Sequence, residues 1–326
     1  MTFVLEDLGD RRALTVDGRT YVTYYSARLV RMLIARKGPH RAPLYFPFKE
    51  TRGRHFLGPL VAHLRARGCA GLSVLEVGCS FGHVTEFLAE QPEIGGITAF
   101  DTDPEFVAMV QTKVDELDLR RVHDVRLLEP EATRRLPWPD GAFDVVLAIG
   151  VIEHLPERMR RAQVDEYYRL VAPGGLIAVL DTPNRVFPLE THSVGLPFVQ
   201  WLPPRLAHRY ARALRRRTYG SMTFADFTAD GGGWRNASLA DCLPSVGRDE
   251  FEDVTEALGY GWRFFRETAR SRTRRALLPA FAITTAMCRA FGGPPSLALP
   301  YFNLVFRRRG ATVLTARAAQ PTIGAR

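Results

Sequence analysis

The middle of the chain alternates short apolar runs with longer amphipathic stretches, and this alternation restricts the fold more than any other feature. Five apolar runs predict strands, at 74–77, 97–100, 124–128, 143–149 and 176–180. The stretches between them predict helices, including one over Glu157–Val171 that ends at Pro173-Gly174-Gly175. Two later runs, 262–267 and 301–306, bring the predicted strands to seven. The pattern predicts an α/β fold with a doubly wound, mostly parallel seven-stranded sheet.

The rest of the chain predicts additions to this sheet. We predict an N-terminal helical cap over 1–65, with helices at Tyr21–Arg36 and His55–Arg67, before a core over 66–184. The rhythm breaks over 185–247, a proline-rich insertion that we interpret as an acceptor lid. Residues 248–310 return to the sheet, with a helix at 249–258 and a second insertion before the last strand. Residues 311–326 are predicted to form a flexible tail.

Composition excludes several classes of protein. The chain has 326 residues, 46% apolar and 24% charged, which excludes a wholly disordered chain. Its four cysteines form no CxxC pair, which argues against a zinc ribbon or a disulfide scaffold and favours a reducing cytoplasm. The first residues lack a signal-peptide pattern. The most apolar stretch, Ala276–Phe291, is too short and too interrupted to predict a membrane span.

A glycine turn follows the first core strand, in the run Val74-Leu75-Glu76-Val77-Gly78-Cys79-Ser80-Phe81-Gly82. Glycines at such a turn let the backbone approach a ligand closely. The spacing matches neither the dinucleotide fingerprint GxGxxG nor the Walker A motif. Glu76 would repel a pyrophosphate but attract a ligand that carries an ammonium and a sulfonium group. Asp101, at the end of the next strand, is placed to accept hydrogen bonds from two ribose hydroxyls.

These residues resemble the class I S-adenosylmethionine-dependent methyltransferases, which have a Rossmann-like fold. The resemblance extends from about Ser73 to Asn184. It includes three further stretches: Leu136-Pro137-Trp138-Pro139-Asp140-Gly141-Ala142-Phe143-Asp144, Val151-Ile152-Glu153-His154-Leu155-Pro156, and Leu170-Val171-Ala172-Pro173-Gly174-Gly175. It implies that the cofactor is S-adenosyl-L-methionine.

The resemblance also implies roles for individual residues at the cofactor. Glu76, Gly78 and Gly82 would contact its methionine end, and Asp101 would hold its ribose. Glu131 and Ala132 would lie along the adenine, and Ile149 near the methionyl group. Many members of the family have glycine at the position of Ser80, whose hydroxyl could help to bind the carboxylate of the cofactor.

The acceptor must be placed by other residues. A hydroxyl acceptor needs a group that removes its proton, and His154, after the fourth predicted strand, is our leading candidate for this base. Glu153, next to it in the sequence, is also predicted to be catalytic. The alternative is that Glu153 and His154 only shape the wall of the site. After the fifth strand, Asn184, Arg185 and Glu190 are predicted to bind the substrate and His192 to take part in catalysis; the alternative there is a polar loop that bonds its own backbone.

The sequence predicts a small-molecule acceptor, with the hydroxyl of a sugar, a phenol or a lipid-linked precursor preferred. We predict no metal, because Gly150 stands where related enzymes of quinone and RNA methylation have a glutamate ligand. The segment 205–217 carries six arginines and is amphipathic, which is compatible with peripheral membrane contact, whereas nucleic-acid binding is not favoured. Three alternatives stay open: a metal-assisted methyltransferase, a membrane-associated one that acts on lipid, quinone or RNA, and a cofactor-binding, non-catalytic partner subunit.

Overall fold

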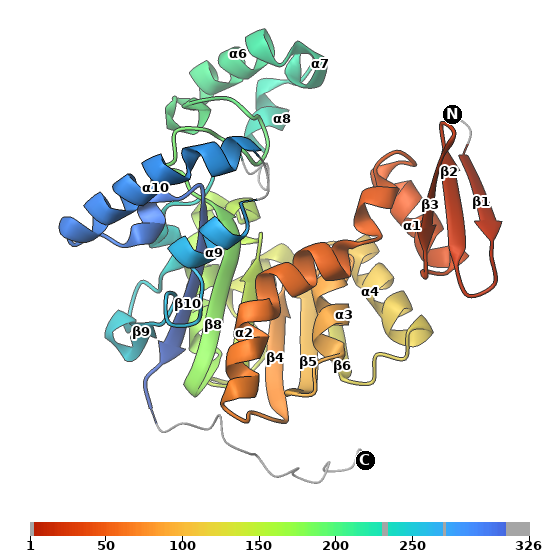
Figure 1. Cartoon of the computed structure of the whole chain (residues 1–326), viewed down its shortest axis with the longest axis horizontal. Helices are drawn as coiled ribbons and strands as arrows, with labels where there is room; N and C mark the ends of the chain where they lie inside the picture. Colours follow the sequence, from red (N-terminus) through yellow and green to blue (C-terminus); the bar gives the residue numbers. More distant parts are fainter. Residues whose placement is uncertain (1–2, 230–233, 270–271, 311–326) are drawn as a thin grey trace. The chain divides into compact units, whose positions relative to one another are not determined.

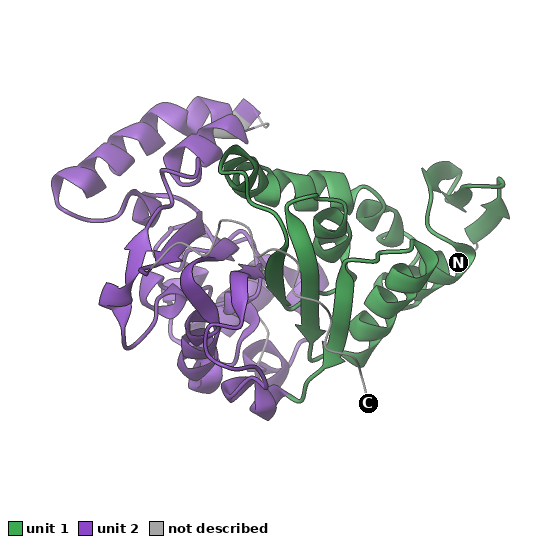
Figure 2. Cartoon of the chain, turned by 90° about the horizontal axis from the view of Figure 1, so that it is seen from below, with its two compact units in different colours: residues 1–129, 315–326 green, residues 130–314 purple. Residues whose placement is uncertain are grey.

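The computed structural model describes residues 3–229, 234–269 and 272–310, and it divides between Glu129 and Pro130 into two compact units (Figure 2). A seven-stranded sheet has the order β6-β5-β4-β7-β8-β10-β9. The predicted mixed α/β fold with a seven-stranded, mostly parallel sheet is therefore confirmed. The first unit contains the strands from β4 to β6, and the second contains those from β7 to β10.

The first unit opens with a small antiparallel sheet of β1 (Phe3–Asp7), β2 (Arg12–Val16) and β3 (Arg19–Thr23) (Figure 1). The predicted helical cap over 1–65 did not include this sheet, which occupies residues 3–23. Asp17 and Gly18 both have positive φ and join two strands as a two-residue loop, with Val16 paired to Arg19. An Asp-Gly pair is a strong local signal for such a hairpin, because it tolerates left-handed backbone at both positions.

Four helical segments follow this sheet, one of them a short 3₁₀ helix at Ala42–Tyr45. The helix α1 (Ala27–Lys37) begins after Ser26, whose side chain accepts a hydrogen bond from the N–H of Leu29. The predicted start at Tyr21 was therefore too early, because β3 occupies the residues up to Thr23. A π-helical turn at Lys49–Arg54 leads directly into α2 (His55–Ala66), which lies close to its predicted position.

The core of the first unit is a parallel array of β4 (Leu72–Val77), β5 (Ile94–Asp101) and β6 (Val122–Leu127). The helices α3 (His83–Ala89) and α4 (Pro104–Glu116) connect these strands and contact β5. A buried ion pair links the two helices, because Lys113 Nζ lies 2.9 Å from Glu86 Oε2. Lys113 also donates to the hydroxyl of Tyr25 at 2.8 Å, which ties the N-terminal segment to this core.

The second unit contains β7 (Phe143–Ile149) and β8 (Val171–Pro183), which are parallel, with α5 (Glu157–Arg169) between them. The strand β10 (Tyr301–Arg308) pairs antiparallel with β8, and β9 (Phe251–Asp253) pairs antiparallel with β10. Both β7 and β8 are buried along almost their whole length, as expected for inner strands of an α/β sheet.

Two insertions leave this array. The first, between β8 and β9, carries α6 (Pro204–Leu214), α7 (Arg216–Tyr219) and α8 (Phe224–Thr228) around a small apolar core of its own. The second, between β9 and β10, carries α9 (Trp262–Glu267) and α10 (Arg272–Ala290). They follow the fifth and sixth strands of the sheet, as predicted.

Two predicted elements near residue 260 were wrong. Residues 249–258 were predicted as a helix but contain β9, and 262–267 were predicted as a strand but form α9. Ladder pairing with β10 and an ion pair between Glu252 and Arg307 hold the β9 segment extended. In α9 the adjacent residues Phe264 and Phe265 are both buried. A half-buried strand would point these two side chains to opposite faces of the sheet and would expose one of them.

The predicted domain boundaries at 65/66, 184/185 and 247/248 stay predictions, and the predicted tail 311–326 lies outside the described residues.

Candidate functional site

The first unit holds the glycine turn at the end of β4. Parallel pairing continues past the strand, because the N–H groups of Gly78 and Cys79 both donate to the carbonyl oxygen of Phe100, at 2.9 and 3.1 Å. Three alternate residues of the turn have left-handed backbone, with φ of 66° at Gly78, 49° at Ser80 and 69° at Gly82. The left-handed region explains why glycine suits the position of Ser80.

This turn and the end of β5 are joined through Asp101. Its Oδ2 accepts the N–H of Ser80 at 2.8 Å, and its Oδ1 accepts those of Thr102 and Asp103 at 2.8 and 3.0 Å. Burial raises the pKa of Asp101, and these three N–H bonds oppose the shift. The N-cap of α4 is Asp103. Asp101 is thus a largely buried acceptor held against the turn.

Glu76 lies at the end of β4 and is almost fully buried. Its Oε2 accepts a hydrogen bond from Thr85 Oγ1 at 2.6 Å. Burial, reinforced by the charge of Asp101, raises the pKa of Glu76 to about 8. A cationic ligand would favour the ionised form of this carboxyl. Sequence reasoning missed Thr85, although its position on the helix after the turn was a usable signal.

The chemistry of these residues suits S-adenosyl-L-methionine. An open left-handed turn offers backbone approach, a buried carboxyl complements an ammonium group, and a second carboxyl at a strand end complements ribose hydroxyls. The structure brings five of the predicted cofactor residues together: Glu76, Gly78, Ser80, Gly82 and Asp101. Their contacts with the cofactor stay predictions.

The other three predicted cofactor residues belong to the second unit. Glu131 and Ala132 lie in the exposed 3₁₀ turn Pro130–Arg134, where Glu131 is 3.9 Å from Arg158. Ile149 is the last residue of β7 and is partly buried. Their cofactor contacts stay predictions as well.

The second unit brings Glu153, His154 and His192 together. The first two lie in a 3₁₀ turn, Ile152–His154, directly after β7, and His192 lies in the loop after β8. The Nε2 atoms of the two histidines are 3.1 Å apart. Glu153 Oε1 lies 3.9 Å from His192 Nδ1 and 4.0 Å from His154 Nε2. Glu153 is buried, whereas nearly half of the His154 side chain is exposed.

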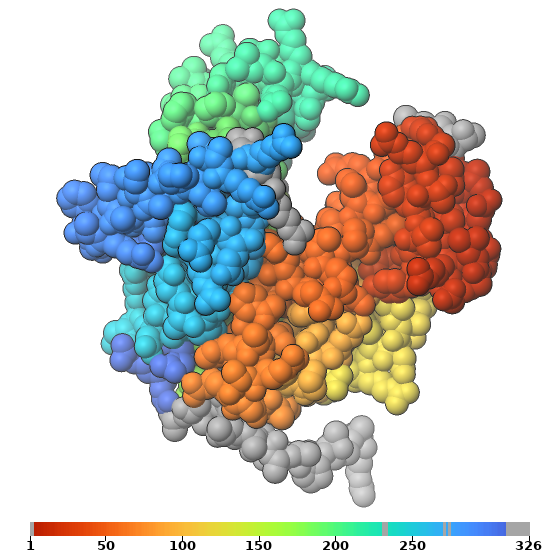
Figure 3. All heavy atoms as spheres, viewed as in Figure 1, coloured from red at the N-terminus to blue at the C-terminus, as the bar shows by residue number. Residues whose placement is uncertain are grey.

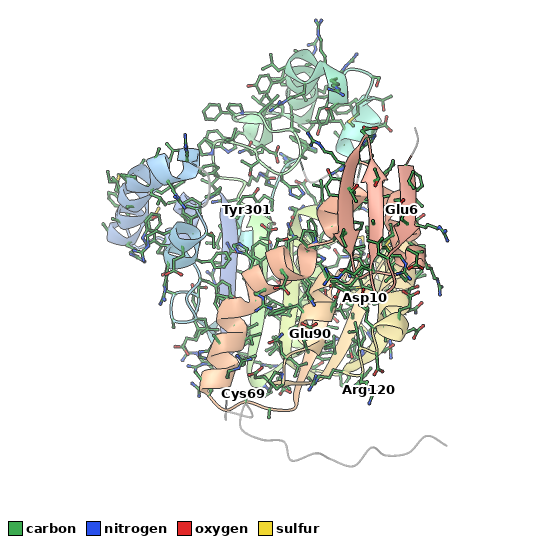
Figure 4. All side chains as sticks on the ribbon, turned by 45° about the vertical axis from the view of Figure 1, so that its right-hand side comes forward. Glu6, Asp10, Cys69, Glu90, Arg120 and Tyr301 are labelled. Atoms are coloured by element: carbon green, nitrogen blue, oxygen red, sulfur yellow. The ribbon has the colours of Figure 1, made fainter. Side chains whose placement is uncertain are left out.

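A buried carboxylate holds the loop that carries His192. Glu190 is completely buried, and its two oxygens accept four backbone N–H groups, those of His192, Ser193, Val194 and Gly195, at 2.6–2.8 Å. The hydroxyl of Tyr301, labelled in Figure 4 at the start of β10, accepts a hydrogen bond from Thr191 Oγ1 at 2.7 Å. Both contacts fix the position of His192 relative to the strands.

The predicted substrate residues Glu190 and Asn184 therefore have structural partners. Asn184 is completely buried, and its amide donates to the carbonyl oxygens of Leu297 and Leu299 at 3.0 and 2.8 Å. Its Oδ1 accepts the N–H of Val186 at 2.9 Å. These bonds occupy the polar atoms of both side chains. We therefore assign neither Asn184 nor Glu190 a direct contact with the acceptor. Arg185 is partly exposed, with Nη1 4.0 Å from Glu157.

Within the described ranges, Glu153, His154 and His192 are also the group that could hold a metal ion, since their donor atoms lie within 4.8 Å of one another. Two imidazoles and a carboxylate form a common donor set for divalent transition metals. The sequence predicted a catalytic role for His192 and no metal. The observed geometry is a chain, because His192 turns Nε2 to His154 and Nδ1 to Glu153.

Comparison with known proteins agrees with the chemistry of the turn. Residues 74–175 match the sequence model of a family described as a methyltransferase domain. This match over residues 74–175 confirms the resemblance to the class I S-adenosylmethionine-dependent methyltransferases that was noted in the sequence.

Three curated relatives show the extent of the similarity. A probable S-adenosylmethionine-dependent methyltransferase of Mycolicibacterium smegmatis is 34% identical over 37% of this chain and 42% of its own length. A demethylmenaquinone methyltransferase of Listeria welshimeri is 35% identical over 35% of this chain and 47% of its own. A ubiquinone biosynthesis O-methyltransferase of Psychrobacter cryohalolentis is 31% identical over 44% and 54%. The matches span about half the length of these relatives.

Glu76→Gln provides a test of the buried carboxyl. A pKa raised from 4.5 to about 8 means that the folded state favours the neutral acid, so its stabilising effect is complete below pH 4.5 and is lost as the pH rises through 8. We expect wild-type stability to fall relative to Glu76→Gln between pH 5 and 8.5, measured by urea unfolding. Removing the charge should also weaken binding of S-adenosylmethionine by roughly 10- to 100-fold at pH 8.5, measured by calorimetry.

The matched control is Glu116→Gln on the exposed end of α4, which should change neither quantity. Equal cofactor affinity in wild type and Glu76→Gln across this pH range would contradict the assigned role of the carboxyl.

Chelator treatment tests the histidine cluster. Because the two Nε2 atoms already face each other at hydrogen-bond distance, we expect methyl transfer to persist after dialysis against EDTA. The measurement is transfer of labelled methyl before and after dialysis. Activity that disappears with EDTA and returns with magnesium, manganese or zinc would show that the cluster is a metal site.

Proposed function

We propose that the protein transfers a methyl group from S-adenosyl-L-methionine to a hydroxyl group of a small-molecule acceptor. The observation that carries this proposal is the Glu153–His192–His154 chain after β7 and β8, which provides a base for hydroxyl chemistry. Bound S-adenosyl-L-methionine supplies the electrophilic methyl group. The turn and carboxylates of the first unit support binding of that cofactor.

In this proposal His154 removes the proton from the acceptor hydroxyl. His192 faces its ring at 3.1 Å, so it can share a hydrogen bond with the imidazolium that forms, and the buried Glu153 side chain lies within 4.0 Å of a ring nitrogen of each histidine. Glu190 keeps His192 in place through the loop N–H groups. The positive charge is then shared within the group of Glu153, His192 and His154, whereas a single exposed histidine would carry it alone.

An oxygen acceptor agrees with one of the relatives, whose printed name is a ubiquinone biosynthesis O-methyltransferase. A second relative is named a demethylmenaquinone methyltransferase. We therefore favour a phenolic hydroxyl within the wider class of sugar, phenol and lipid-linked acceptors. A phenol also loses its proton more readily than an alcohol, which suits a histidine base.

A membrane-associated version of this activity is favoured by the two insertions. Neither 191–225 nor 268–310 contains an acidic residue, and the first carries six arginines between 205 and 217. In the second, α10 exposes Leu277, Ile283 and Met287, and Phe291 is exposed just beyond its end; the last three recur at intervals of four residues. Figure 3 shows α10, in blue, at the surface of its unit.

Basic residues combined with an exposed apolar stripe suit an anionic lipid surface. Among the described residues, no helix combines the length and apolarity needed to cross a bilayer. A contact would therefore be peripheral, and it would give the enzyme access to a lipid-linked acceptor.

His154→Ala tests the base. We expect kcat to fall by roughly 10²- to 10⁴-fold while the affinity for S-adenosylmethionine stays constant, because the proton acceptor is lost and the glycine turn is untouched. Transfer of labelled methyl to a panel of catechols, sugars and polyprenyl phenols provides the assay, and His40→Ala on the exposed N-terminal segment is the control.

Unchanged kcat in His154→Ala at saturating acceptor would remove the base from the proposal. If wild-type protein binds the cofactor but turns over no member of the panel, a non-catalytic partner subunit would become the better interpretation.

Sedimentation with vesicles tests the membrane contact. We expect the protein to bind vesicles containing phosphatidylglycerol but not pure phosphatidylcholine, because residues 191–225 and 268–310 carry basic but no acidic side chains. Replacing both Ile283 and Met287 by serine should weaken binding, whereas the same change at Val246 in the 3₁₀-rich segment before β9 should not. Equal binding of both α10 forms, or none to anionic vesicles, would contradict this contact.

A further inference from the structure

Three guanidinium groups gather around a charged cavity of about 370 Å³ in the second unit. Its lining residues are all ionisable: Glu157, Arg160, Arg185, Arg235 and Asp241. The sequence indicated only Arg185, because the other four come from the start and middle of α5 and from the first insertion. A cavity with such a lining suits a small charged group rather than an apolar one.

The first insertion closes this cavity by folding back onto the end of β8. Asn184 forms a parallel bridge to Ala237, and the N–H of Arg185 donates to the carbonyl oxygen of Ala237 at 2.8 Å. Arg235 and Asn236 immediately precede this bridge, and Asn236 has left-handed backbone with φ of 56°. Arg185 and Arg235 are therefore placed at one site by backbone pairing.

The two carboxylates do not balance the three arginines. Glu157 is shared, lying 3.4 Å from Arg235 Nη1 and 4.0 Å from Arg185 Nη1. Asp241 is 3.5 Å from Arg160 Nη1, but the same Oδ2 accepts the N–H and hydroxyl of Ser238, each at 2.8 Å. The lining keeps one positive charge in excess.

Two further observations concern the surroundings of Arg235 and Arg185. The Nε atom of Arg235 is buried and has no hydrogen-bond partner within the described part of the chain. Burial, reinforced by the neighbouring charge of Arg235, lowers the pKa of Arg185 although Glu157 and Asp241 oppose the shift. An anion in the cavity would relieve both conditions.

The cavity is adjacent to the turn that carries the proposed base. Arg160 is buried, and its Nη2 donates to the carbonyl oxygens of Glu153 at 3.3 Å and Leu155 at 3.0 Å. These two residues flank His154 in the chain. A group bound by the arginines would therefore lie beside the turn that presents His154.

We propose that this cavity binds an anionic group of the acceptor, a phosphate or a carboxylate, and so selects acceptors that carry one beside the reacting hydroxyl. This proposal rests on the proposed function only in assuming that the anionic group belongs to the methyl acceptor. Binding of an anion in the cavity does not itself require methyl transfer. Arg185 and Arg235 form the direct contacts, since both are partly exposed, whereas the buried Arg160 links the cavity to the turn. The guanidinium group of arginine can bind either a phosphate or a carboxylate through two parallel hydrogen bonds.

The test is calorimetric titration of the full chain, without cofactor, with inorganic phosphate, pyrophosphate and benzoate at low ionic strength. We expect saturable binding of at least one probe, and the preferred probe distinguishes a phosphate from a carboxylate ligand. Arg185→Ala and Arg235→Ala should each weaken this binding at least tenfold, since each removes a charge-assisted contact. Arg19→Ala, at the exposed start of β3, is the matched control and should not.

Glu157→Gln is expected to increase the affinity for the anionic probe rather than decrease it. Removing the carboxylate shared by Arg185 and Arg235 should tighten binding of the same probe severalfold, and a variant that fails to fold cannot mimic this result. Binding that is equally strong in the double variant Arg185→Ala/Arg235→Ala, or absent in both wild type and Glu157→Gln, would overturn the proposal. Because no methyl transfer is measured, these outcomes are independent of those for His154→Ala.

Discussion

Parallel pairing of buried strands is the constraint on which the rest of the structure depends. Parallel strands end on one side of a sheet, so the residues that follow them become neighbours in space although they are distant in sequence. Pairing of β4 with β5 brings the glycine turn to Asp101, and pairing of β7 with β8 brings the turn of His154 to the loop of His192. The candidate residues of each unit are brought together in this way.

Buried charged groups then give these strand ends a defined geometry. Glu190 gathers four backbone N–H groups, and Arg160 holds the carbonyl oxygens on both sides of His154. Neither residue needs to touch a ligand to matter for the site. The desolvation that makes each buried charge costly is offset by several hydrogen bonds, and those bonds order the loop or turn around it.

The two insertions contribute the residues on which the proposals about the acceptor and the membrane depend. The first supplies Arg235 and Asp241 to the charged cavity and carries the arginine-rich segment, and the second supplies the exposed apolar stripe of α10. The matched region of the methyltransferase family, 74–175, ends before either insertion begins. Arg185, Arg235 and Asp241 of the proposed anion site therefore lie outside the matched region, whereas Glu157 and Arg160 lie within it.

Local chemistry in the sequence was enough to predict the sheet, the glycine turn and the carboxylates Glu76 and Asp101, because a strand, a turn and the next strand depend on neighbours in the chain. The Asp17-Gly18 hairpin was equally local, and the signal was overlooked. Only tertiary structure decided that Glu190 holds a loop, that 251–253 is a strand and 262–267 a helix, and that Arg160, Arg185 and Arg235 share a cavity. Those outcomes depend on which distant backbone or charge each residue meets, and residues 38 positions apart, as His154 and His192 are, leave no pattern in the sequence that records their contact.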